Sequence, residues 1–267
     1  MLGALIGDIV GSRFEWNNIK TKDFDFLTVE CKATDDSIMT LAIAKTLIDC
    51  HGEYSKLGEQ VVKYMRAFGR HYPYCDYGSM FRHWLNAELP QPYGSYGNGA
   101  AMRVSTCAHV AKSLEEAIDL SRIVTEVTHN HPEGIKGAEA TTVAIYMAKT
   151  GRSISEIKEH IHQHYYPMDF TLNSIRDRYT FDGSCQGTVP QAIMAFLESN
   201  SFEDAVRNAI SIGGDSDTLA AITGSIAEAY YGIPAELREE IMDYLDDFQI
   251  RILEEFDEIF KKYHVIK

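Results

Sequence analysis

Apolar residues recur at helical spacing along most of the chain. Residues 38–49 are apolar on more than one face, which predicts a helix surrounded by other elements. A second apolar helix is predicted after Asp217, and Gly232 followed by Pro234 is typical of its end. Strand signals are weak, because no segment alternates apolar and polar residues for long. The pattern therefore predicts an all-α protein.

Local signals mark further helices. Residues 113–116 (Ser-Leu-Glu-Glu) and 153–156 (Ser-Ile-Ser-Glu) match the capping box, in which a serine and a glutamate satisfy each other's backbone N–H groups. Pro190 is expected in the first turn of another helix. The stretch from Glu236 to Tyr263 is interpreted as two helices, because it has apolar residues at helical spacing: Leu237, Ile241, Leu245, Phe248, Ile252, Phe256 and Ile259.

Small residues recur at close spacing, which indicates helices whose backbones approach closely. They are Gly3, Gly7 and Gly11; Gly137 and Thr141; and Ala221, Gly224 and Ala227. No internal repeat, low-complexity tract or long linker divides the chain. We therefore expect residues 1–267 to form a single compact domain of many helices.

The composition limits the kinds of molecule that the protein is expected to bind. The 267 residues include 25 Lys and Arg against 39 Asp and Glu, which gives a net charge of −14. Such an acidic protein is not expected to bind nucleic acid or anionic membranes through charge, and we expect a monomer. A small molecule that carries phosphate is not excluded, because a metal ion or a nest of backbone N–H groups can overcome the charge.

The compartment is inferred from the N-terminal residues and from the cysteines. Residues 1–16 lack a basic region and Asp8 interrupts their apolar run, so they are not expected to be a signal peptide. No stretch approaches the roughly 20 apolar residues of a membrane helix. The five cysteines are scattered and form no Cys-x-x-Cys, which indicates reduced thiols. We therefore expect a cytoplasmic protein without membrane contact.

Two acidic motifs each open an apolar helix. Residues 34–36 (Thr-Asp-Asp) precede one helix, and residues 213–218 (Gly-Gly-Asp-Ser-Asp-Thr) precede the other. Helix capping explains the first motif by itself, because the helix dipole stabilises negative charge at an N-terminus. The second motif is harder to explain as a cap, because a second carboxylate adds repulsion. We therefore expect both motifs to surround a cation, and oxygen ligands of this kind suit Mg²⁺, Mn²⁺ or Ca²⁺.

Two further segments carry candidate ligand contacts. The glycine-rich residues 93–103 (Tyr-Gly-Ser-Tyr-Gly-Asn-Gly-Ala-Ala-Met-Arg) can cradle a phosphate, although such a segment is often only a turn. Residues 77–79 (Tyr-Gly-Ser) offer a second turn of small residues. In residues 128–134 (Thr-His-Asn-His-Pro-Glu-Gly), the proline suits a first helical turn. Either histidine there can bond a phosphate or ribose, or serve as a cap or core residue.

Three other features are not interpreted as sites. The histidines at 160, 162 and 164 are two residues apart, and such residues do not face the same side of a helix. Tyr179 and Phe181 can stack on a base, but packing is the default interpretation. Asp76 is interpreted as a solvated loop residue rather than a contact to an acceptor.

Taken together, the motifs resemble those of the ADP-ribosylglycohydrolase family. Five blocks in the same order carry the resemblance and span most of the chain. They are GALIGDIVGSRFE, TDDSIMTLA, GNGAAMRVS, THNHPEGIKGA and GGDSDTLAAITGSIAEAYYG. The resemblance implies an all-α orthogonal bundle of many helices and two Mg²⁺ or Mn²⁺ ions. It also implies an activity: hydrolysis of the bond between the distal ribose of ADP-ribose and an acceptor on a protein or small molecule.

The resemblance also implies roles for individual residues. The implied metal ligands are Thr34, Asp35, Asp36, Asp215, Asp217 and Thr218. The implied catalytic residues are Glu15, on a mobile loop near the metals, together with Asp36 and Asp217. The implied substrate contacts are Tyr77, Gly78, Gly97, Asn98, Gly99, Ala100, Met102, His129 and His131. Two alternatives stay open: a phosphohydrolase that cuts the pyrophosphate with the same ligands, and an ADP-ribose-binding relative without activity.

Overall fold

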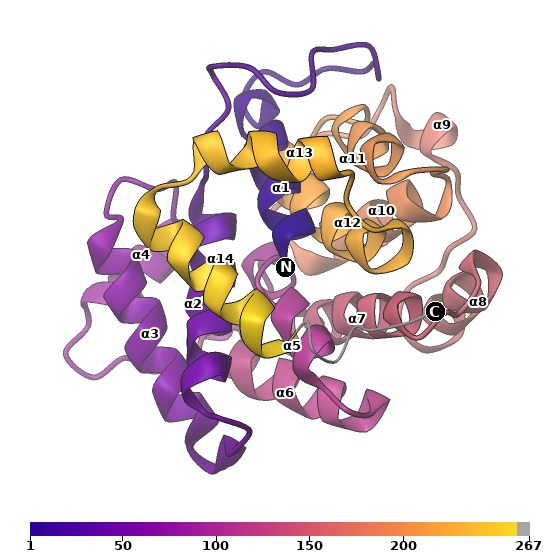
Figure 1. The fold of residues 1–267 in the computed structure, drawn as a ribbon. Helices are drawn as coiled ribbons and strands as arrows, with labels where there is room; N and C mark the ends of the chain where they lie inside the picture. The colour runs from indigo at the N-terminus through magenta and orange to yellow at the C-terminus, as the bar shows by residue number, and fades with distance from the viewer. Residues whose placement is uncertain (261–267) are drawn as a thin grey trace.

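The computed structural model describes residues 1–260, and this part of the chain contains fourteen α-helices and no strand (Figure 1). This confirms the all-α prediction. The helices are α1 (Leu2–Gly11), α2 (Asp35–Asp49), α3 (Leu57–His71), α4 (Ser79–Asn86), α5 (Ser105–Val110), α6 (Leu114–Glu126), α7 (Pro132–Lys149), α8 (Ile154–His164), α9 (Leu172–Ile175), α10 (Cys185–Leu197), α11 (Phe202–Ile210), α12 (Ser216–Tyr231), α13 (Ala235–Glu240) and α14 (Asp247–Phe260). Short 3₁₀ turns cover Ser12–Phe14, Tyr54–Lys56, Asn98–Ala100 and Ile241–Tyr244.

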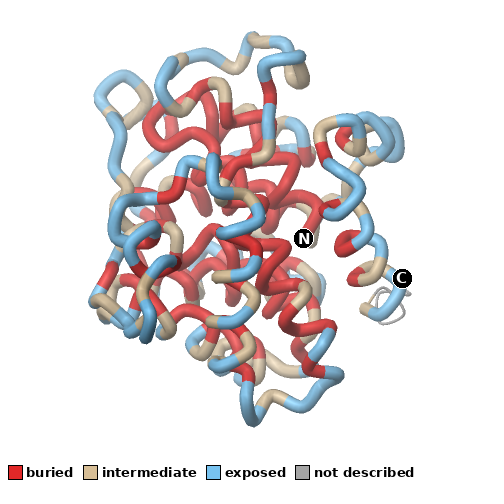
Figure 2. Tube along the Cα trace, turned by 90° about the vertical axis from the view of Figure 1, so that its left-hand side faces the viewer, coloured by how far each residue is buried: buried red, intermediate tan, exposed pale blue. Residues whose placement is uncertain are grey.

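The centre of the molecule is formed by helices that are apolar on nearly all faces. All ten residues of α1 are buried, and α2, α7, α10 and α12 are buried along most of their length. The amphipathic helices α3, α6, α8, α11 and α14 lie outside them (Figure 1). Figure 2 shows the same division, with buried chain inside and exposed loops around it. The position of α2 confirms the prediction of a surrounded helix at residues 38–49.

Helices α1 and α12 touch through their backbones, as the small-residue spacing predicts. A β-carbon on Gly7 would lie 2.0 Å from the carbonyl oxygen of Ala220, which leaves no room for any other residue at this position. A β-carbon on Gly11 would lie 2.6 Å from the Cα of Asp217. The glycines therefore bring the end of α1 against the start of α12, where the second acidic motif lies.

The two expected capping boxes differ in the structure. At α8, the Ser153 hydroxyl accepts the N–H of Glu156, and the glutamate accepts the N–H of Ser153, so the box is confirmed. At α6, the Ser113 hydroxyl accepts the N–H of Glu116 at 3.1 Å. The carboxylate of Glu116 reaches one residue further back and accepts the N–H of Lys112 at 2.6 Å. Only the serine half of the expected box is therefore present at α6.

The prediction for Pro190 was wrong. Helix α10 begins at Cys185, so Pro190 lies inside the helix rather than in its first turn. The true cap is Ser184, whose hydroxyl accepts the N–H of Gly187 at 3.2 Å. A proline within a helix removes one backbone hydrogen bond. Pro190 is buried, and local sequence rules do not include the tertiary packing that places it there.

The end of α12 and the C-terminal region agree with the sequence. Gly232 follows α12 with a φ of 75°, a conformation that glycine adopts without strain. The predicted C-terminal stretch forms α13, a 3₁₀ turn and α14, with Ile252 and Phe256 buried. Phe248 and Ile259 are each 37% exposed, so the apolar stripe is only partly covered. Tyr263, the last residue of that prediction, lies outside the described residues.

Candidate metal centre and ligand cavity

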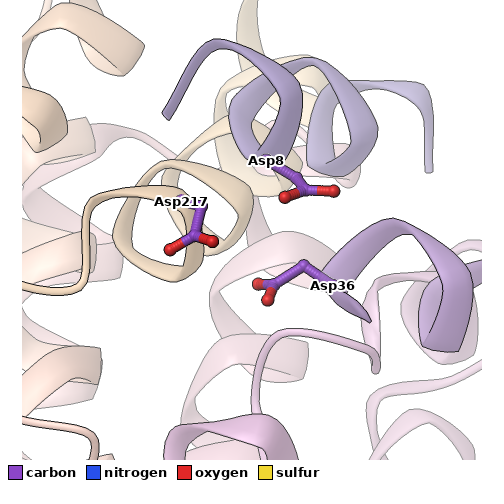
Figure 3. A group of neighbouring side chains, drawn as sticks. All are labelled: Asp8, Asp36 and Asp217. Carbon is purple, nitrogen blue, oxygen red and sulfur yellow. The ribbon is translucent and has the colours of Figure 1, made fainter. Parts of the chain in front are cut away.

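Three aspartates from three helices meet at one point (Figure 3). Asp8 lies in α1, Asp36 in the first turn of α2 and Asp217 in the first turn of α12, and all three are buried. Each offers a carboxylate oxygen within 4.8 Å of the other two. Glu15 and Asp215 form a second group of this kind, again with Asp217. The two acidic motifs therefore come together, and Asp217 is common to both groups.

Asp8 is a part of the site that the sequence analysis missed. Its Oδ2 accepts the N–H of Thr34 at 2.9 Å and the N–H of Ser37 at 3.0 Å. Its Oδ1 accepts the Thr34 hydroxyl at 2.6 Å, and the Ser37 hydroxyl donates to Oδ2 as well. Asp8 therefore caps α2 from a different helix and fixes the start of the first motif. In the sequence it stood out only as an interruption of an apolar run, and its partners lie 26 and 29 residues away.

The carboxylates of the site need positive charge near them. Burial raises the pKa of Asp36 and of Asp217 well above the usual range, and neighbouring carboxylates raise both further. Burial and the charges of Asp8 and Asp215 raise the pKa of Asp35 to about 7. Within residues 1–260, no ion pair reaches any of these groups.

One atom of this cluster provides a direct test of whether a cation fits. The Oδ1 atom of Asp36 is fully buried and has no hydrogen-bond partner within residues 1–260. A buried carboxylate oxygen without a donor is unfavourable unless a cation binds it or a proton neutralises it. The donor set contains only oxygen atoms, as Mg²⁺ and Mn²⁺ prefer. The residues present therefore fit a hard divalent cation.

The two motif threonines point their hydroxyls into the same cluster. The Thr34 hydroxyl lies 2.6 Å from Asp8 and 3.5 Å from Oδ2 of Asp217. The Thr218 hydroxyl donates to Oδ2 of Asp36 at 3.2 Å. Each threonine therefore joins its own helix to a carboxylate of another helix, and each hydroxyl oxygen retains lone pairs that a cation can use.

Glu15 approaches the cluster on a turn that follows α1. Burial, with the charges of Asp215, Asp76 and Asp35 in addition, raises the pKa of Glu15 to about 7. The turn is tied down by Asn18, which the sequence analysis did not single out. Its side-chain amide donates to the carbonyl of Glu15 at 3.0 Å.

Asn18 also joins this turn to the second acidic motif. Its amide donates to the carbonyl of Gly214 at 2.8 Å, and its Oδ1 accepts the N–H of Gly214 at 2.7 Å. Gly213 and Gly214 have φ angles of 69° and 82°, which residues with side chains rarely adopt. A β-carbon on Gly214 would lie 2.4 Å from the ring of Tyr179. The glycines before Asp215 are therefore needed both for the turn and for close approach.

A cavity of about 390 Å³ opens over the carboxylates. Twelve of the residues that the family resemblance implied lie on its wall: Glu15, Asp35, Asp36, Gly78, Gly97, Asn98, Gly99, Met102, His129, Asp215, Asp217 and Thr218. Thr34, Tyr77, Ala100 and His131 are not on this wall. Thr34, Tyr77 and Ala100 are buried behind it. The structure thus brings the acidic motifs, the glycine-rich segment and one histidine to one cavity.

The glycine-rich segment is held to the metal side by Asn98. Its side-chain amide donates to Oδ2 of Asp215 at 2.7 Å and to the hydroxyl of Thr188 at 3.1 Å. Its backbone N–H donates to the carbonyl of Gly183 at 2.8 Å. Both amide hydrogens are therefore in use, and in this structure Asn98 orients a carboxylate of the second motif.

The two histidines of residues 128–134 have different positions. His129 is buried and lines the cavity. His131 is the N-cap of α7, where its Nδ1 accepts the N–H of Glu133 at 3.1 Å, and Pro132 is the first helical residue as expected. The ring of His131 lies beside that of Tyr96, with centroids 5.1 Å apart. The capping interpretation therefore holds for His131.

The structure also shows where the histidines of residues 160–164 and the aromatic residues 179 and 181 lie. His160 and His164 contact each other on the surface helix α8, and Nδ1 of His162 accepts the N–H of Met168 at 3.0 Å. Tyr179 donates to the carbonyl of Gly187, as packing predicts. Phe181 instead lies at the cavity wall.

The mouth of the cavity carries an aromatic pair and an ion pair. Phe181 stacks on Trp16, with centroids 5.3 Å apart and planes inclined by 15°. Trp16 is 73% exposed. Asp76 pairs with Lys32 at 3.1 Å, and its side chain is 42% exposed. Asp76 also lines the cavity.

The fold and the site define a class of protein: an all-α bundle whose cluster of buried carboxylates can hold a metal ion beneath a ligand cavity. The comparison with known proteins identifies the family. The family model described as ADP-ribosylglycohydrolase matches residues 1–264. The chain therefore belongs to the ADP-ribosylglycohydrolase family, the enzymes that hydrolyse glycosidic bonds of ADP-ribose. This confirms the family, the fold class and the kind of enzyme expected from the sequence.

Individual relatives agree with this assignment. The chain is 26% identical over 312 residues to ADP-ribosylhydrolase ARH3 of Mus musculus, covering 87% of this chain and 83% of that protein. It is 26% identical over 272 residues to ADP-ribosylarginine hydrolase Tri1 of Pseudomonas putida (strain GB-1), covering 90% and 72%. A solved structure described as an ADP-ribosylglycohydrolase-related protein complex has a TM-score of 0.71, 20% sequence identity and coverage of 97% and 95%. This last match supports the fold.

Proposed function

We propose that the protein is a metal-dependent hydrolase that cleaves the bond between the distal ribose of ADP-ribose and an acceptor, with two divalent cations in the acidic cluster. The observation that carries the proposal is the closeness of Asp217 to carboxylates of both motifs: oxygens of Asp36, and of Asp215 with Glu15, lie within 4.8 Å of an Asp217 oxygen. A carboxylate in this position can contact two neighbouring cations. The proposed ions are Mg²⁺ or Mn²⁺.

Six residues of the two motifs are proposed to hold the cations: Thr34, Asp35, Asp36, Asp215, Asp217 and Thr218. Asp8 is excluded from this set because its two oxygens already accept four hydrogen bonds. When bound, the cations polarise a water molecule and orient the hydroxyl groups of the distal ribose. Tyr77, Gly78 and the segment from Gly97 to Met102 are proposed to contact the substrate, with His129 and His131 beside them.

The residues of this chain perform the remaining steps. Glu15 lies at the edge of the cluster with a pKa raised to about 7, so near neutral pH it can both accept and release a proton. It accepts a proton from the attacking water as the bond to the acceptor breaks at the anomeric carbon. Asp36 and Asp217 stabilise the positive charge that develops on the ribose. The acceptor leaves with a proton, and ADP-ribose is the other product.

The proposal is tested by the release of ADP-ribose. Arginine-, serine- and O-linked ADP-ribosyl substrates are incubated with the protein in Mg²⁺ or Mn²⁺, with and without EDTA. We expect release from at least one substrate, and EDTA should abolish it. Asp217→Ala should lose both metal binding and release, whereas Asp169→Ala, a change at a side chain that is 80% exposed, should keep both. Absence of release from every substrate would sink the assignment.

Product analysis separates the remaining alternatives. A phosphohydrolase acting on the same substrates would give AMP and a ribose phosphate that still carries the acceptor. A relative without activity would bind ADP-ribose but release no acceptor in Mg²⁺. The acceptor itself, the monomeric state, the single domain and the cytoplasmic location stay predictions. None of the helices within residues 1–260 is long and apolar enough to cross a membrane.

A further inference from the structure

Arg103, at the end of the glycine-rich segment, is a buried cation without a carboxylate partner. Only 1% of the residue is exposed, and within residues 1–260 no salt bridge reaches it. Its Nη2 donates to the hydroxyl of Thr128 at 2.7 Å and to the carbonyls of Val124 and Thr125 at 3.3 and 3.5 Å. A guanidinium only donates hydrogen bonds. The Thr128 oxygen therefore acts as an acceptor toward Arg103.

The Thr128 hydroxyl has one proton left to donate, and the structure directs it. Two acceptors are near: Nδ1 of His129 at 2.7 Å and the carbonyl of Thr125 at 3.5 Å. That carbonyl already accepts the backbone N–H groups of Thr128 at 3.2 Å and His129 at 2.9 Å. Since its lone pairs are occupied and it is farther away, the hydroxyl proton goes to Nδ1. Nδ1 is then an acceptor and carries no hydrogen.

The other ring nitrogen of His129 must then carry the hydrogen. Burial and the charge of Arg103 lower the pKa of His129 well below its usual value, so the ring is neutral. A neutral imidazole has one N–H group, which is therefore at Nε2. Nε2 lies against the glycine turn at the cavity wall, because β-carbons on Gly97 and Gly99 would be 3.5 and 3.4 Å from it. Within residues 1–260 this atom has no hydrogen bond of its own.

We propose that Arg103 and Thr128 are positioning residues that hold His129 in its Nε2–H tautomer, so that it donates a hydrogen bond to a phosphate oxygen of ADP-ribose. The ligand part of this inference rests on the proposed function. An anionic phosphate oxygen is an acceptor only, so the opposite tautomer would place two acceptors face to face. Arg103 also supplies positive charge behind the phosphate subsite of a protein whose net charge is −14.

The tautomer is measured first, in protein without ligand. Nitrogen-15 NMR of labelled histidine distinguishes Nδ1–H from Nε2–H, and the His129 signals are assigned by their loss in His129→Asn. We expect hydrogen at Nε2 over the range pH 6 to 8. In Thr128→Val the hydroxyl is lost, and the signals should shift toward the other tautomer. Thr128→Ser keeps a hydroxyl and should restore the wild-type signals. Hydrogen at Nδ1 in the wild type would overturn the proposal.

Binding of ADP-ribose is measured next, by calorimetry in Mg²⁺. We expect Thr128→Val to weaken binding by about tenfold or more, because a hydrogen bond to a charged group is lost. Thr128→Ser should recover most of the affinity. The matched control is Thr125→Val, because the Thr125 hydroxyl is equally buried and has no partner within residues 1–260. It should bind like the wild type. In a His129→Ala background, Thr128→Val should have no further effect, since Thr128 acts through the histidine.

The outcomes separate this inference from the proposed function. Wild-type protein that binds ADP-ribose without releasing any acceptor contradicts the hydrolase, and the affinity of Thr128→Val still decides whether Thr128 positions His129. Equal affinity of Thr128→Val and wild-type protein for ADP-ribose contradicts the positioning role of Thr128, even if turnover is normal. Absence of ADP-ribose binding in the wild type contradicts the phosphate contact, and the NMR result still decides the tautomer. Unfolding temperatures of all variants identify any loss of binding that comes from loss of fold.

Discussion

Replacing Asp8 by alanine tests whether this residue organises the site or only adds another negative charge to it. The carboxylate accepts four hydrogen bonds, two of them from the backbone N–H groups of Thr34 and Ser37. The two hydroxyls can rotate toward other acceptors, but the two N–H groups cannot. A buried donor without a partner costs about 2 kcal/mol, so the two together predict a loss of about 4 kcal/mol in the free energy of unfolding.

The sign of the change separates the two possible roles. In metal-free protein, Asp8 is a third buried carboxylate beside Asp36 and Asp217, and its removal also relieves repulsion. If repulsion dominated, Asp8→Ala would be more stable than the wild type in EDTA. We expect it to be less stable, because fixed donors lose their acceptor in a buried environment. Urea unfolding in EDTA measures the difference, and a stabilised variant would refute the reasoning.

A smaller change provides the comparison. Ser37→Ala removes one of the four hydrogen bonds to Asp8 and leaves both backbone donors paired, so it should cost only about 1 kcal/mol. Calorimetry with Mg²⁺ adds a second measurement. Because Asp8 orients the hydroxyl of Thr34, we expect Asp8→Ala to bind Mg²⁺ about 10–100-fold more weakly than the wild type. Unchanged Mg²⁺ affinity would show that the start of α2 does not depend on Asp8.

Three further changes have defined outcomes. The pKa of Asp35 and of Glu15 is raised to about 7 in the folded protein, so metal-free protein should lose stability as pH rises from about 4 to 7. Thermal unfolding should therefore show a larger gain in stability from Mg²⁺ at pH 8 than at pH 5. Gly7→Ala should lower the free energy of unfolding by about 3 kcal/mol or more in denaturant titrations, because its β-carbon would collide with the backbone of α12. An unchanged free energy of unfolding would contradict the backbone contact between α1 and α12. Asn18→Ala should reduce kcat at least about tenfold, because it releases the turn that carries Glu15. The control is Asn17→Ala, a change at an exposed neighbour, which should leave kcat unchanged. Equal kcat values for the two variants would contradict the role of Asn18 in holding this turn.

The sequence predicts those parts of the site that local patterns encode. The acidic motifs precede apolar helices, and in the structure both form the first turns of α2 and α12. The glycine spacing of α1 predicts close backbone contact, and Gly7 makes it. The prediction that the two motifs meet rested on the repulsion between their carboxylates and on the family resemblance. No local pattern records which helices become neighbours.

The missed residues share one property: each has a partner that is distant in sequence. Asp8 binds Thr34, Asn18 binds Gly214 and Arg103 binds Thr128. A lone aspartate in an apolar helix, an asparagine in a polar loop and an arginine after a glycine turn carry no pattern that indicates such contacts. Pro190 was misplaced for a related reason, because a buried proline inside a helix reflects tertiary packing that local rules do not include.

The backbone contact between α1 and α12 has a consequence for synthesis on the ribosome. Helix α1 precedes α12 in the chain, yet all its faces are buried and its closest partner begins at Ser216. The growing chain must therefore carry an incompletely covered apolar helix until α12 has been made. The acidic cluster cannot assemble before Asp217 emerges, so an incomplete chain has no cation site. Completion of the fold should accordingly be slow and dependent on the translation of α12.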